Sequence, residues 1–320
     1  MRKFLFYLTS FLLLFIAFAL IYNPERYIKS CFEGLTVWAI TVLPSLLPFF
    51  FISLLFTNLG IAGKFCKKLE KPVCYLYKTS PISSFVQFMS FISGYPVGAK
   101  LISELYKEGI INEEESTKIS LFTSTSGPMF IVGSVGVGMF KNKTAGIILL
   151  CAHYLSAILN GLIFRRLGLK KRRTYQINCT LKQTDNILYD CAYGATLSCL
   201  VVGAFISLFY VFCQIIDDFN LLYPLTLFFS FLFCDKEKAR AFCAGLIECT
   251  NGCILFSTTQ GFLTLPLSAF IISFGGLSIL FQSISYLQQA KVNIKLFLLS
   301  KVLQAITAFL ITALLTLVIF

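Results

Sequence analysis

The sequence predicts an all-α polytopic membrane protein, arranged as an inverted-topology repeat with two re-entrant helical hairpins and broken transmembrane helices. Of its 320 residues, 57% are hydrophobic and only 13% are charged, about half the charged share of a soluble domain. Several apolar runs are long enough to cross a bilayer. Some of them are broken by glycine, proline and polar residues, which hydrocarbon tolerates only where protein or water covers the exposed backbone.

The patterns of charge and cysteine exclude several other classes of protein. The net charge is +12, but the lysines and arginines form short blocks between apolar runs. Such blocks orient membrane proteins, so we expect no nucleic-acid partner. The twelve cysteines include no C-x-x-C pair and His153 is the only histidine, so neither a metal site nor a disulfide framework is predicted. The chain also lacks a P-loop, a Gly-x-Ser-x-Gly motif and paired intramembrane carboxylates, so we expect no enzymatic activity, no catalytic residue and no cofactor.

Residues 1–33 are expected to form an N-terminal transmembrane helix followed by a short loop. The apolar run from 4 to 22 contains Ala17-Phe18-Ala19, which resembles a signal-peptide cleavage site, but the run is longer than a usual signal peptide needs. We favour an uncleaved helix and keep a cleaved signal peptide as the alternative. A first repeat is then expected over 34–165. Its first span carries Pro44 and Pro48, which kink a helix that either faces lipid or lines a substrate path.

Two basic blocks, at 64–78 and 165–182, should both face the cytoplasm. Three apolar segments lie between the blocks, so one segment cannot cross the membrane. The segment at 82–105 is broken in its middle by Gly94-Tyr95-Pro96, and we predict that it enters and leaves on the same side as a re-entrant hairpin. The acidic stretch at 104–118 would then be a short soluble piece in the cytoplasm.

The second half of the chain repeats this order. A basic cytoplasmic linker at 166–185 leads to a second repeat at 186–320. Each repeat reads as a span, a short interfacial segment, a broken hairpin, a broken span and a closing span. The first repeat is predicted to begin outside and the second inside, which makes the two an inverted-topology pair. This topology places the basic residues at 236–240 on the outer side of the membrane, which is contrary to the usual preference of basic residues for the cytoplasmic side.

The broken segments are the predicted substrate site, because free backbone groups at half-helix ends hold substrates in many secondary transporters. Lys100 either reaches for the interface or presents a cation to an anionic substrate. Glu248 is a carboxylate inside an apolar run, which is a functional hypothesis by default, with capping of its own hairpin as the alternative. His153 is expected to be a hydrogen-bonded packing residue rather than a proton relay. The candidate substrate-binding residues are Ser93, Gly94, Tyr95, Pro96, Gly98, Lys100, Ser126, Gly127, Pro128, Glu248, Thr250, Asn251, Gly275 and Gly276.

Several segments, in matching order, resemble a known family. They lie at 43–50, 93–100, 126–133, 153–155, 245–252 and 274–276, and Ser93-Gly94-Tyr95-Pro96-Val97-Gly98-Ala99-Lys100 is the most specific. Together they resemble the YlbJ (SpoVV) sporulation integral membrane proteins of endospore-forming bacteria. That family belongs to the nucleoside-recognition gate domain group, related in fold to concentrative nucleoside transporters. The resemblance implies a transporter that moves dipicolinate across the outer forespore membrane during sporulation.

We therefore expect a membrane transporter for a small organic anion. The alternatives are a nucleoside-type transporter of the same fold and a non-transporting membrane scaffold in sporulation, which would recruit partners through 104–118 and 165–182. The expected partners are the organic anion and the lipid bilayer, with further copies of this chain or other sporulation membrane proteins as additional candidates. The expected location is the cell membrane, specifically the outer forespore membrane.

Overall fold

A computed structural model describes residues 2–167 and 186–319, and these residues form helices and connecting turns with no β-strand among them. Five of the described helices are long and apolar enough to cross a membrane: Pro24–Phe56, Lys143–Arg166, Ile187–Asp218, Thr264–Leu287 and Ile294–Val318. The predicted all-α polytopic class is therefore confirmed. Most of the predicted basic linker, 168–185, lies outside the described residues.

The chain begins with α1 (Arg2–Tyr22), and its next three elements form one long helix. These are α2 (Pro24–Val37), the π-helical turn η1 (Trp38–Val42) and α3 (Leu43–Asn58). The expectation of a short loop before residue 34 is wrong, because the chain is helical from Pro24 onward. Proline is favourable in the first turn of a helix, where its missing N–H would have no partner. The expected domain boundary at 33/34 therefore falls inside a continuous helix.

The rest of the first half contains both of its predicted breaks. After α4 (Ile61–Tyr77), α5 (Ile82–Ser93) and α6 (Val97–Lys107) are separated by the break at 94–96. Next, α7 (Glu113–Thr123) and the π-helix η2 (Met129–Met139) are separated at 124–128. Finally, α8 (Lys143–Ile163) ends in the 3-10 turn η3 (Phe164–Arg166).

The acidic stretch at 104–118 is exposed at Glu104, Glu108, Glu113 and Glu114, and its place in the cytoplasm stays a prediction, but its last residues are part of the packed protein. Residues from Glu115 to Thr123 on α7 are buried. The Lys118 ammonium donates hydrogen bonds of 3.0–3.1 Å to the backbone carbonyls of Lys78, Arg165 and Leu167. These carbonyls provide the acceptors that let a lysine be buried, so α7 is part of the folded interior.

The second half has the same sequence of elements as the first. It contains α9 (Ile187–Asp218), α10 (Tyr223–Phe233), α11 (Lys236–Ile247), α12 (Cys249–Ser257), α13 (Thr264–Phe274), α14 (Gly276–Leu287) and α15 (Ile294–Ile319). The pair α11–α12 corresponds to α5–α6, and α13–α14 corresponds to α7–η2. The break between α11 and α12 is at Glu248 rather than at the neighbouring glycines. The inverted orientation and the re-entrant path of each pair stay predictions.

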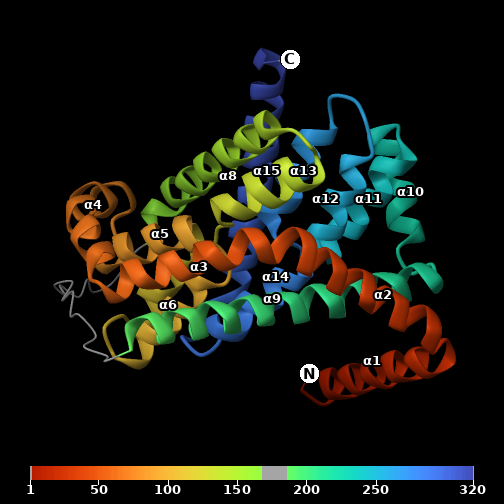
Figure 1. The fold of residues 1–320 in the computed structure, drawn as a ribbon, viewed down its shortest axis with the longest axis horizontal. Helices are drawn as coiled ribbons and strands as arrows, with labels where there is room; N and C mark the ends of the chain where they lie inside the picture. The colour runs from red at the N-terminus through yellow and green to blue at the C-terminus, as the bar shows by residue number, and fades with distance from the viewer. Residues whose placement is uncertain (1, 168–185, 320) are drawn as a thin grey trace.

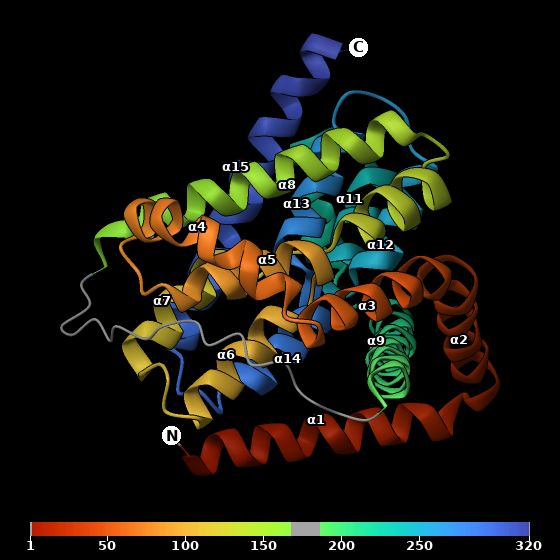
Figure 2. The same cartoon turned by 60° about the vertical axis from the view of Figure 1, so that its left-hand side comes forward.

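The two halves pack together along their long helices. Figure 1 shows α9 running beside α2 and α3 at one side of the molecule, while α15 passes behind α8 and α13. Figure 2 shows α1 lying along the outer edge, where Ala19 joins a small buried cluster with Tyr27, Val211 and Ile215. This arrangement brings the short broken helices of both halves into the interior between the long ones.

Candidate functional site

The two breaks of the first half are in direct backbone contact. Gly94 has a φ of +78°, and a Cβ added there would lie 2.2 Å from the backbone nitrogen of Gly127. The hydroxyl of Thr125 donates to the Ser90 carbonyl at 3.0 Å. A Cβ on Gly98 would lie 2.5 Å from the Thr123 carbonyl oxygen. Glycine is therefore needed at 94 and 98 for the two broken helices to approach each other.

The breaks of the second half meet in the same way. A Cβ on Gly276 would lie 2.9 Å from the Gly245 carbonyl oxygen and 3.1 Å from the backbone nitrogen of Cys249, and both Gly275 and Gly276 have positive φ. Glu248 is buried, and its Oε2 accepts a 2.7 Å hydrogen bond from the Asn251 backbone N–H. This bond caps α12, as the alternative for Glu248 expected, while its functional role stays a prediction.

His153 on α8 joins the two halves. Its Nε2 accepts a 2.8 Å hydrogen bond from the Ser126 backbone N–H, and its Nδ1 lies 2.8 Å from the Ser273 hydroxyl. Because Nε2 is an acceptor, this hydrogen-bond pattern assigns the proton to Nδ1, which donates to Ser273. His153 is thus a buried, fully hydrogen-bonded residue, as expected, and it links the break of α7–η2 to the end of α13.

Lys301 on α15 is a second link between the halves, and the sequence patterns did not predict it. Its side chain is 1% exposed. The ammonium donates to the Tyr95 hydroxyl at 2.7 Å, the Ser124 carbonyl at 3.0 Å and the Gln304 side-chain oxygen at 3.2 Å. Among the described residues, no carboxylate lies within ion-pair distance of it. The sequence feature that could have indicated Lys301 is its place inside the last apolar run, because charged residues within a membrane span are rare and usually functional.

A cavity of about 50 Å³ lies where the breaks of the two halves face each other. Ser278, which lines it, has a buried hydroxyl with no hydrogen-bond partner. The other polar or backbone lining comes from Ser93, Tyr95, Ser126, Gly127, Glu248, Thr250 and Gln282, and the apolar lining from Leu46, Phe130, Val202, Ile206 and Ile279. The cavity is therefore a small polar site with apolar walls, built from both repeats.

The structure separates the predicted site residues into three groups. Those that line the cavity are Ser93, Tyr95, Ser126, Gly127, Glu248 and Thr250. Those that shape the surrounding breaks without lining it are Gly94, Pro96, Gly98, Pro128, Asn251, Gly275 and Gly276. Lys100 belongs to neither group, because it lies exposed on α6. Ser278, Gln282 and Lys301 were missed. In the described part of the chain, no group of His, Cys, Asp or Glu is placed to hold a metal.

No protein-family model matches the chain. It is, however, 30% identical over 321 aligned positions to the sporulation integral membrane protein YlbJ of Bacillus subtilis (strain 168), an alignment that covers 92% of this chain and 79% of the relative. The chain belongs to the YlbJ family. This YlbJ-family protein is a multi-pass integral membrane protein, as both the relative's name and the five apolar helices indicate. No solved structure matches it.

Proposed function

We propose that this YlbJ-family protein transports a small organic anion, dipicolinate, across the outer forespore membrane during sporulation. The observation that carries the proposal is the cavity at the four helix breaks, with the buried cation Lys301 behind one of its walls. Broken helices that meet between two repeats are where secondary transporters hold their substrates. The related fold of concentrative nucleoside transporters, implied by the resemblance, is part of the same proposal.

The charge of Lys301 favours an anionic substrate. A buried charge is normally balanced by a partner of opposite sign, whereas Lys301 has only neutral acceptors among the described residues. Its ammonium donates to the oxygen of Tyr95, and the Tyr95 hydroxyl in turn donates to the Ser273 carbonyl at 3.5 Å. Turning that hydroxyl hydrogen from this long bond into the cavity would let Tyr95 donate to a substrate carboxylate. Hydrogen bonds to a carboxylate are stronger than those between neutral groups. Lys301 would then act as a positioning residue for Tyr95.

The remaining lining suits an aromatic dicarboxylate. Ser93, Ser126 and Ser278 offer hydroxyl donors. The Ser278 hydroxyl has no hydrogen-bond partner among the described residues. Phe130 and Ile279 offer apolar surface on which a pyridine ring can pack. Dipicolinate has two carboxylates on such a ring and only acceptors on its polar edge. Donors and apolar walls together therefore match its chemistry.

The cavity has a closed conformation. Its volume of about 50 Å³ is enough for only a few water molecules. A substrate with a six-membered ring needs the broken helices to separate. Alternating access by rocking one repeat against the other would supply that movement.

A nucleoside is the second candidate substrate, because Glu248 also lines the cavity. A carboxylate accepts hydrogen bonds from sugar hydroxyls, but it repels a dicarboxylate held nearby. For the anion to bind, Glu248 must be protonated or must stay turned toward its own cap at Asn251. The two candidate substrates therefore differ in whether Glu248 helps or opposes binding.

Uptake into liposomes that contain the purified protein tests the proposal. We expect the wild type to accumulate labelled pyridine-2,6-dicarboxylate, and we expect both Lys301→Met and Tyr95→Phe to lose at least 90% of the uptake. Lys100→Met is the matched control: it removes a lysine that lies exposed on α6 and should retain uptake. Transport of uridine in place of the dicarboxylate would favour the nucleoside candidate. Absence of both fluxes from folded wild-type protein would favour the scaffold.

A further inference from the structure

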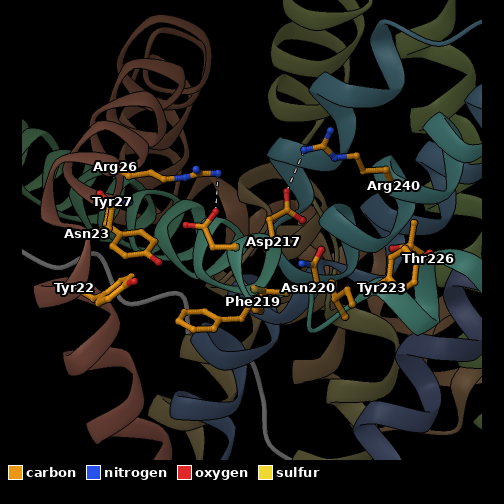
Figure 3. Close-up of a pocket in the computed structure, with 13 residues that line it drawn as sticks. Tyr22, Asn23, Arg26, Tyr27, Asp217, Phe219, Asn220, Tyr223, Thr226 and Arg240 are labelled. Carbon is orange, nitrogen blue, oxygen red and sulfur yellow. Dashed lines mark hydrogen bonds and ion pairs between the residues drawn. The ribbon is translucent and has the colours of Figure 1, made fainter.

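A second set of hollows lies away from the central cavity, at the ends of α2, α9 and α10. The outer one is a cleft of about 680 Å³. Figure 3 shows Arg26 on one side of the cleft and Arg240 on the other, with Asp217 between them. Arg26 pairs with Asp218 at 2.6 Å, and Arg240 pairs with Asp217 at 3.1 Å. The cleft is thus lined by two ion pairs, and in each pair the positive and negative charges balance.

An inner chamber of about 160 Å³ lies next to this cleft, on the side of α11 and α12. Asp217, Leu222, Thr226 and Arg240 line both hollows, so only these side chains lie between the two. The chamber ends against α11 and α12, where Ile247 and Asn251 line it. These residues flank Glu248, whose Oε2 accepts the Asn251 N–H and whose side chain lines the central cavity. The break at Glu248 is therefore the wall between the chamber and the cavity.

The chamber has a net negative charge. Its charged lining residues are Glu33, Asp217 and Arg240. Asp217 is paired with Arg240, while Glu33 forms no ion pair with any described residue. A hollow whose charges sum to one sign concentrates ions of the opposite sign. With the exposed carboxylate of Glu33 as its one unpaired charge, the chamber favours a cation over an organic anion.

We propose that the cleft and the chamber form a water-filled route along which a monovalent cation, a proton or a sodium ion, reaches Glu248 from this face. This rests on the proposed transport function and deepens it, because it gives the carrier a coupling ion and keeps the organic anion on another path. A proton would pass from chamber water to the Glu248 carboxylate and later to water on the cavity side. The other titratable groups around Glu248 are Tyr210 and Cys213 of α9, Cys249 and Cys253 of α12, and, across the cavity, Tyr95 with Lys301 behind it.

Two native cysteines allow a test that needs no transport. Cys213 lines the chamber, whereas Cys234 is exposed between α10 and α11 and lines neither hollow. Wild-type protein is treated with a cationic thiosulfonate, 2-(trimethylammonium)ethyl methanethiosulfonate, or with its anionic sulfonatoethyl counterpart. Mass spectrometry measures each rate at Cys213 relative to Cys234. We expect the cationic reagent to be favoured at Cys213 at least tenfold, and Glu33→Gln to reduce that preference. Equal relative rates, or no modification of Cys213 by either reagent, would overturn the proposal.

Modification of Glu248 by dicyclohexylcarbodiimide, which requires a protonated carboxyl, separates the two cations. Slower modification in sodium chloride than in choline chloride identifies sodium. Equal rates in the two salts, with modification at neutral pH where an ordinary carboxyl is ionised, identify the proton. No modification of Glu248 at neutral pH in either salt would refute the cation route. Because neither experiment involves dicarboxylate flux, a positive result here with no flux in liposomes would leave the route intact and reject only the proposed substrate.

Discussion

Gly94 is among the most constrained positions in the described part of the fold. Its positive φ and its contact with Gly127 impose separate costs on any side chain. Gly109 isolates the first cost, because it has a similar φ of +69° but no atom within 4 Å of an added Cβ. The pair Gly94 and Gly109 therefore distinguishes backbone strain from steric exclusion.

We predict that Gly109→Ala lowers the free energy of unfolding by about 1–2 kcal/mol, the usual cost of a left-handed conformation for a residue with a Cβ. Gly94→Ala should lower it by several kcal/mol more, since the backbone at Gly127 must move, and Gly94→Leu should abolish uptake. Thermal unfolding in detergent measures the difference. Equal unfolding temperatures for the two alanine variants would show that the breaks do not need to touch.

The link through His153 is also testable at single positions. His153→Phe leaves the Ser126 N–H and the Ser273 hydroxyl without their partner, and Ser273→Ala removes one of the same bonds. Buried hydrogen bonds contribute about 0.5–1.5 kcal/mol each, and orphaned groups cost more. We predict a coupling energy of about 1 kcal/mol between the two substitutions in a double-mutant cycle. Additive effects on unfolding would contradict a direct bond.

At the scale of the element, α11 begins with a charged cap whose effect depends on pH. The Asp235 carboxylate accepts the Lys238 backbone N–H at 3.0 Å and also pairs with the Lys238 ammonium. The hydrogen bond to the Lys238 side chain, followed by that to its backbone, lowers the pKa of Asp235. A lowered carboxyl pKa stabilises the folded state above the unfolded pKa of about 3.9, and this stabilisation is lost as pH falls through the folded value.

We predict that Asp235→Ala destabilises the first turn of α11 by about 1 kcal/mol, the typical value of an N-cap. Asp235→Asn should retain most of the cap and lose its acid sensitivity. Hydrogen exchange of the first α11 amides, compared between pH 3 and pH 6, measures both effects. An asparagine variant whose protection falls with pH as the wild type does would mean that another group causes the acid effect.

The elements also show where sequence patterns were sufficient and where they failed. Gly94 and Gly275 interrupt apolar runs in the sequence, and the helices end at both positions in the structure. Both residues have positive φ, which ends a helix whatever surrounds it. By contrast, the burial of Lys118 on α7 could not be predicted, because nothing in the sequence indicates that distant carbonyls accept its hydrogen bonds. Likewise, Lys301 and Ser278 come to the site from helices whose neighbours are set by tertiary packing alone. Turn chemistry is local and predictable, whereas the partners of buried polar groups are not.

At the scale of the whole molecule, the predicted topology places α5 and α6 on one side as a re-entrant pair. Glu113 and Lys143 lie at the starts of α7 and α8, and under this topology the broken segment between them crosses the membrane once. We predict that cysteines placed at 113 and 143 react with impermeant reagents from opposite sides of the membrane. Glu113 and Lys291 form an ion pair at 3.0 Å, so a cysteine at 291 should react from the same side as one at 113. Labelling of 113 and 143 from one side would reject the hairpin assignment.

The crossed hydrogen bonds at the centre have a consequence for leakage. A residue of the first half, His153, holds Ser273 of the second, while Lys301 of the second half holds Tyr95 and Ser124 of the first. Separating the two halves at the site would therefore break bonds that come from both halves. Under the proposed transport function, opening would be one cooperative movement of one half against the other. A helix that loosened by itself would leave the remaining cross-bonds in place, so these bonds would oppose a partial opening that leaks ions.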